Sequence, residues 1–140
     1  MQGHDIAAAL RVLPELAIEA RTSEEQANAA MEIVAPFNDC MVGVVRFSGQ
    51  TPWERHPQDE LLYVLDGEVA VTVLGDEGRS EASIAKGSLF IVPAGRWHRQ
   101  LPSPSVTLLF ITSAQGTSHS HAEDPRVDGG ERGAVSEPRS

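Results

Sequence analysis

Residues 87–98, Gly-Ser-Leu-Phe-Ile-Val-Pro-Ala-Gly-Arg-Trp-His, form an apolar run and a Pro-Gly turn that leads to His98. An earlier stretch, 53–60, reads Trp-Glu-Arg-His-Pro-Gln-Asp-Glu and precedes another apolar run. If its first half is extended, side-chain alternation places Glu54 and His56 on the same face. Histidines and carboxylates gathered from different strands suit a divalent ion such as Mn, Fe, Ni, Cu or Zn.

The residues around these stretches have the pattern of short strands separated by turns. The Asp66-Gly67 pair between two apolar runs predicts a hairpin. Short strands at near-regular spacing favour an all-β sandwich, barrel or jelly roll whose interior can hold a small ligand. The predicted strands are 40–48, 61–66, 68–74, 81–85, 88–92, 96–101 and 106–112.

The N-terminal region predicts short helices around a short strand. Asp5 caps the first helix, and residues 15–21 alternate in the manner of a strand. Ser23 and Gln26 have the spacing of a capping box, and the apolar face that follows predicts a second helix as far as Pro36.

Composition divides the chain into three parts. Residues 1–38 form an N-terminal helix and strand extension, and 39–112 form a β-domain. Residues 113–140 are polar and contain little that could be buried, which predicts a flexible tail. His119 and His121 lie in this tail, where they could bind a metal ion adventitiously, although a solvated tail is the simpler interpretation.

The overall composition limits the class of protein. The chain has 140 residues, 41% of them hydrophobic, which is enough for one globular domain. A net charge of −9 gives no electrostatic footprint for nucleic acid or an anionic membrane. The single cysteine, Cys40, excludes an internal disulfide. We find neither the features of a signal peptide nor a membrane-spanning run, and therefore expect a cytoplasmic protein.

Two motifs in this chain resemble those of the cupins, which are written G-x5-H-x-H-x3,4-E-x6-G and G-x5-P-x-G-x2-H-x3-N. The resemblance implies a small, single-domain cupin of bacterial type, built as a β-barrel or double-stranded β-helix (jelly roll) over roughly 35–112. The residues that match are His56, Glu60 and Gly67 in the first motif and Gly87, Pro93, Gly95 and His98 in the second.

The chain departs from these motifs at three positions. Glu54 stands where the family has its first histidine, Pro102 replaces the final Asn, and Gly49 is one residue closer to position 54 than the pattern asks. Of these, only the change at Glu54 affects the chemistry.

The resemblance implies that His56, Glu60 and His98 are metal ligands, and the spacing to Gly67 selects Glu60 over Asp59. Three interpretations remain for the first-histidine position. Its carboxylate can be a fourth ligand, so that two carboxylates neutralise a divalent ion, or it can lie outside the ligand set as a proton acceptor and catalytic group. Alternatively, the substitution has abolished metal binding.

The resemblance implies a metal-dependent enzyme of dioxygenase, isomerase or lyase type that acts on a small organic molecule, with Fe, Mn, Ni or Zn as cofactor. Arg46 and Arg96 are candidates to contact an anionic substrate, although strand arginines usually face solvent. The alternative is a non-catalytic cupin that binds or senses a small ligand. We also expect a homodimer, paired through the edge of 15–21 or of 106–112.

Overall fold

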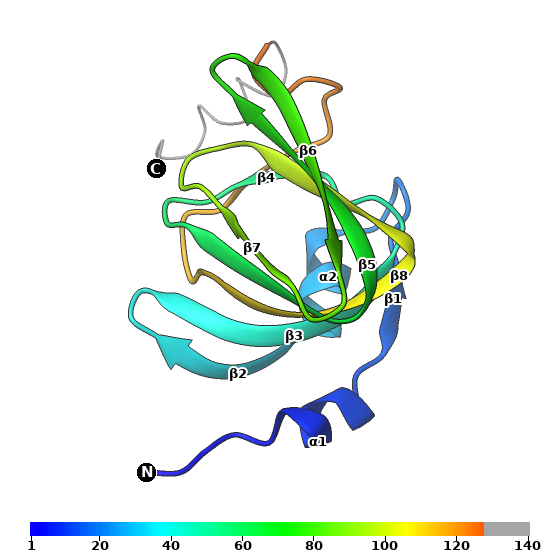
Figure 1. The fold of residues 1–140 in the computed structure, drawn as a ribbon, viewed down its shortest axis with the longest axis vertical. Helices are drawn as coiled ribbons and strands as arrows, with labels where there is room; N and C mark the ends of the chain where they lie inside the picture. The colour runs from blue at the N-terminus through cyan, green and yellow to red at the C-terminus, as the bar shows by residue number, and fades with distance from the viewer. Residues whose placement is uncertain (128–140) are drawn as a thin grey trace.

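The computed structural model describes residues 1–127, which form a β-rich fold with two short helices (Figure 1). The all-β class is confirmed. The helices are α1 (Ile6–Arg11) and α2 (Glu24–Ala30). The strands are β1 (Glu15–Ala17), β2 (Glu32–Phe37), β3 (Cys40–Ser48), β4 (Trp53–Arg55), β5 (Glu60–Gly75), β6 (Gly78–Ala85), β7 (Leu89–Val92), β8 (His98–Ser113) and β9 (Ser118–Ser120).

Two long antiparallel strands, β5 and β8, form the frame of the sheet. They pair from Leu61↔Ile111 to Val73↔His98, and β3 pairs with the other edge of β8. The hydrogen-bonded path through the described strands is β1-β3-β8-β4-β9, with β2 on β3 and with β6 and β7 on β5. This path does not close into a complete barrel, and the strands curl around one interior (Figure 1).

The core lies on the inward faces of these strands. Alternate residues point inward along a strand, and most of the inward positions in the middle of β3, β5 and β8 are apolar and buried. Each such side chain stabilises the fold by about 1.5–3 kcal/mol. The inward residues include Val45, Phe47, Leu62, Val64, Leu108 and Phe110.

The hairpin predicted at Asp66-Gly67 is wrong, because β5 runs through this dipeptide. The pairing of β5 with β8 shifts register on both sides of it. Gly67 has a φ of +81°, and a Cβ there would lie 2.3 Å from the backbone oxygen of Ser105. The dipeptide therefore forms part of a β-bulge, which, like a tight hairpin turn, favours a glycine in the left-handed region. The two strands predicted over 96–101 and 106–112 are likewise one strand, β8.

The second helix begins as predicted and ends early. The Ser23 hydroxyl accepts a hydrogen bond from the Gln26 backbone at 3.0 Å, and the Gln26 side chain accepts one from the Ser23 backbone at 2.8 Å. The helix then ends at Ala30, and β2 takes the place of its predicted last turn. The β-branched residues Ile33 and Val34 favour a strand, and Pro36 is tolerated because β2 is an edge strand.

The polar tail predicted from residue 113 needs correction over its first part. Residues 118–120 form β9, which pairs antiparallel with β4, and Ser118 and Ser120 are buried. Because a strand ladder uses backbone groups, polar residues can extend a sheet without leaving an apolar pattern. The remainder of the predicted tail, 128–140, lies outside the described residues.

Two other predictions concern the strand edge that pairs in a dimer and the absence of a membrane-spanning helix. The 106–112 segment cannot be a dimer edge, because β3 and β5 already pair with its two sides. The described helices are all too short and too polar to span a bilayer.

Candidate metal centre

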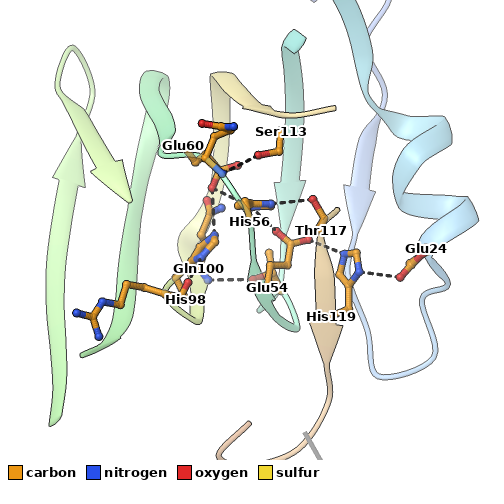
Figure 2. A network of polar contacts seen from close by, with 12 residues as sticks. Glu24, Glu54, His56, Glu60, His98, Gln100, Ser113, Thr117 and His119 are labelled. Atoms are coloured by element: carbon orange, nitrogen blue, oxygen red, sulfur yellow. Dashed lines mark hydrogen bonds and ion pairs between the residues drawn. The ribbon is translucent and has the colours of Figure 1, made fainter. Parts of the chain in front are cut away.

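The sheet brings the four predicted site residues together. Glu54 lies in β4, His56 follows that strand directly, Glu60 begins β5 and His98 begins β8. Glu54 and His98 are cross-strand partners in the β4–β8 pair. Figure 2 shows their side chains pointing toward one another inside the fold.

The functional atoms lie within a few ångströms of one another. Glu60 Oε1 is 3.1 Å from His98 Nε2 and 3.5 Å from His56 Nε2. Glu54 Oε1 is 3.8 Å from His56 Nε2. The ligand atoms that Glu54, His56 and His98 offer all lie within 4.8 Å of one another. These three residues form a group that could hold a metal ion, with Glu60 between the two imidazoles.

Three of these atoms are buried without a hydrogen-bond partner: His56 Nε2, His98 Nε2 and Glu60 Oε1. Buried polar atoms almost always form hydrogen bonds, so three buried atoms that contact only one another, without hydrogen-bond geometry, require an explanation. The opposite ring nitrogens are held in place, because His98 Nδ1 donates to the Arg96 carbonyl oxygen at 3.3 Å and His56 Nδ1 lies 2.8 Å from the Thr117 hydroxyl. This is the outer support that metal-ligating histidines usually have. The donor set fits a divalent metal ion.

The charges of the site are coupled. Burial raises the pKa of Glu60, but contacts with His56 and His98 outweigh it and hold that pKa far below its ordinary value. Burial lowers the pKa of His98, but the Glu60 carboxylate outweighs it and the pKa is raised. Without a metal, the pair therefore exists as a carboxylate beside an imidazolium, and an incoming cation competes with the proton on His98.

A second histidine supports Glu54 from outside. His119 Nε2 donates to Glu54 Oε2 at 3.0 Å, and His119 Nδ1 is 2.7 Å from Glu24 Oε2 on α2 (Figure 2). Burial raises the pKa of Glu54, but the hydrogen bond from His119 and the charge of His56 outweigh it, so the pKa is lowered.

The sequence did not reveal His119 or Thr117 as site residues. Both lie in the segment interpreted as a solvated tail, and the structure shows that this segment reaches the site through β9. The only available signal was the histidine itself in an otherwise polar stretch.

A cavity of about 870 Å³ opens beside the metal centre, and Glu54, His56 and Glu60 form part of its wall. The two arginines considered for an anionic substrate do not line it. Arg46 donates to the Leu13 carbonyl oxygen and to Thr107, and Arg96 pairs with Asp76 at 3.0 Å.

These observations define a β-sheet protein with a histidine and carboxylate site beside an interior cavity, and comparisons give its family. A model of the cupin domain matches residues 43–101. The uncharacterized protein YdbB of Bacillus subtilis is 32% identical over 85 residues, which cover 60% of this chain and 70% of YdbB. The chain belongs to the cupin superfamily.

Solved structures show the same fold. A cupin-2 domain protein from Shewanella frigidimarina has a TM-score of 0.52 and 20% identity, over 59% of this chain and 78% of that one. A hydroquinone 1,2-dioxygenase from a Sphingomonas species has a TM-score of 0.53 and 21% identity, over 64% of this chain and 70% of the dioxygenase. At this level of identity the likeness concerns the fold alone.

Proposed function

We propose that the protein is a metal-dependent cupin enzyme that acts on a small organic molecule in the cavity. One observation supports this above the others: two imidazole nitrogens and a carboxylate oxygen are buried beside that cavity, and their only partners there are one another, at 3.1 and 3.5 Å. Without a ligand, the contacts among these atoms offset only part of the cost of burying them.

In this proposal His56, Glu60 and His98 hold a divalent ion, which is Fe, Mn, Ni or Zn. A bound ion of this kind would act as a Lewis acid toward a substrate oxygen or as a centre for oxygen chemistry. The protein's part is to position the three ligands and to keep bulk water away from them, since His56 and Glu60 are each 5% exposed and His98 is fully buried.

We assign Glu54 as the fourth ligand, through Oε1. His119 occupies Oε2, as expected for a ligating carboxylate that is itself hydrogen-bonded. The Glu54 side chain is 27% exposed, against 7% for Glu60, so it is the carboxylate that a molecule in the cavity can reach. Glu54 is therefore also our candidate to accept a proton from the substrate.

Elemental analysis tests the proposal directly. Protein purified without a histidine tag should contain close to one equivalent of metal, and a His56→Ala, His98→Ala double variant should contain none. An Arg46→Ala variant serves as a matched control, because Arg46 lies off the cavity and should leave the metal content unchanged. Absence of metal from the wild-type protein after reconstitution would refute the proposal.

The cavity also favours a second candidate, a non-catalytic cupin that binds or senses a small ligand. The two candidates differ in their dependence on metal. A ligand that raises the melting temperature only in the metal-loaded protein favours the enzyme, and equal stabilisation without metal favours the binding protein.

We further propose that the protein is a cytoplasmic homodimer. Its single cysteine suits a reducing compartment. Within the described residues β1 and β2 each pair with β3 alone, and β2 exposes Ile33 and Phe37. An edge of this kind is commonly covered by a second chain.

A further inference from the structure

One part of the cavity wall, away from the metal centre, is apolar. It is formed by inward-facing side chains of β3, β5 and β8 and by side chains from β1 and from the residues that follow α2. Strand alternation aims these side chains at the interior and places their polar neighbours outside. The wall includes Ile18, Met31, Met41, Phe47, Leu62 and Phe110.

The cavity has almost no positive charge for a substrate anion. Of the side chains of residues 1–127 that line it, Arg99 has the only guanidinium or ammonium group. The Arg99 guanidinium lies 4.3 Å from the centre of the Trp53 ring. Since His98 and Gln100 are the inward residues of this strand, Arg99 lies on its other face, away from the metal centre. A carboxylate on a substrate body that lies along the inward faces of β3, β5 and β8 would therefore find no guanidinium or ammonium group there, and burying it unpaired would be strongly unfavourable.

Two neutral polar groups of β8 also line the cavity. Gln100 Oε1 and Thr112 Oγ1 are buried, and neither has a hydrogen-bond partner among the described residues. Both side chains line the cavity, and Gln100 lies beside His98 (Figure 2). An amide and a hydroxyl can each donate and accept, so they suit an uncharged polar group close to the metal centre.

On the basis of the proposed function, we propose that the substrate is an uncharged molecule with an apolar body of at least ring size and one oxygen-bearing group near the metal centre. A volume of about 870 Å³ accommodates such a body. Small dicarboxylates and other molecules with a charged body are excluded from this class by the absence of an inward-facing cation.

Hydroxamic acids test this inference, because the metal-binding group stays constant while the body changes. Binding to the metal-loaded full chain is measured by calorimetry for acetohydroxamic, benzohydroxamic and 3-carboxypropanohydroxamic acids. The phenyl body should bind at least about tenfold more tightly than the methyl body, since it buries more apolar surface. The carboxyethyl body should bind no more tightly than methyl. Equal binding of phenyl and methyl, or tighter binding of the carboxyethyl compound, would overturn the inference.

Failure of the metal site is distinguished by repeating the comparison on metal-free protein with benzamide and succinamate. If benzamide binds there and metal adds nothing to hydroxamate binding, the proposed function fails and the apolar specificity stands. If metal strengthens every hydroxamate by the same factor, whatever its body, the metal site stands and the specificity fails.

A pair of variants on β3 tests the wall itself. Met41 lines the cavity, whereas Val42 is outside its lining and, by strand alternation, faces the other side. Met41→Lys should reduce phenyl binding by about tenfold or more and allow the carboxyethyl compound to bind, because it supplies the missing cation. Val42→Lys adds the same charge to the same strand and should preserve the wild-type order. Preservation of that order in a folded Met41→Lys variant would overturn the inference.

Discussion

Removing His119 should weaken metal binding although His119 is not a ligand in our assignment. Its Nε2 donates to Glu54 Oε2 at 3.0 Å and its Nδ1 is 2.7 Å from Glu24, so the imidazole holds Glu54 against α2. In His119→Ala, Glu54 loses its outer hydrogen bond and can rotate away from His56. Loss of such a supporting partner typically costs 10- to 100-fold in metal affinity, or about 1.4–2.7 kcal/mol.

The effect on folding should be smaller. His119 and Glu54 are about one-quarter exposed, and ion pairs near the surface contribute about 0–1 kcal/mol. A small change in melting temperature accompanied by a large change in metal affinity therefore indicates a positioning role, whereas a structural role would affect both together.

The assay is a zinc titration in competition with a chelating dye, at one fixed pH for all variants. His119→Gln should recover part of the affinity, because its amide can still donate to Glu54. Glu24→Gln should have a smaller effect, since Glu24 contacts only the outer ring nitrogen. His121→Ala, an exposed histidine in the same segment, is the matched control and should match the wild type. If His119→Ala binds zinc within about twofold of the wild type, the positioning argument is wrong.

Further predictions concern the fold, pH and assembly. Gly67→Ala should lower the stability by about 3 kcal/mol and the melting temperature by about 10 °C. Gly87 has a similar φ but open space around it, so Gly87→Ala should cost only about 1 kcal/mol. Equal melting temperatures for the two variants would contradict this prediction. Because the pKa of His98 is raised by Glu60, its stabilisation of the metal-free protein is fully present below pH 6.5 and is lost as the pH rises through the folded-state pKa. The melting temperature of the metal-free protein should thus rise on acidification toward pH 6.5, while the increase in melting temperature caused by added metal becomes smaller. If both quantities rise together on acidification, the proton on His98 does not compete with the metal. Sedimentation should show a dimer that Phe37→Glu weakens, and a monomeric wild type at micromolar concentration would refute it.

The parts of this structure that could be predicted from the sequence are those in which a residue contacts its close neighbours in the chain. The Ser23–Gln26 capping box is satisfied by backbone groups three residues away, and its geometry is fixed wherever the helix lies. The spacing from His56 to Glu60 similarly corresponds to the short connection between β4 and β5. These features were predicted with their residues, and His56, Glu60 and His98 meet in the structure.

The features that could not be predicted from the sequence depend on contacts with strands that are distant in the chain. The Asp66-Gly67 dipeptide suits a hairpin and a bulge equally, since both favour glycine at positive φ, and the partner strand β8 decides between them. The position of β9 depends on the open edge of β4, to which it pairs through backbone groups. The side chains of residues 118–120 have no pattern from which that pairing could be predicted.

The substitution at position 54 and the arrival of His119 can be understood together. A histidine at position 54 would be a neutral ligand, whereas Glu54 brings a second carboxylate beside Glu60, and two neighbouring carboxylates repel each other. A divalent ion would neutralise that pair, and His119 offsets the charge of Glu54 from the opposite side. Since the same imidazole also contacts Glu24, it joins α2 and β9 at the wall of the cavity to the strand that presents Glu54. A carboxylate at this position therefore depends on a cationic donor outside the ligand set, and β9 is the element that supplies it.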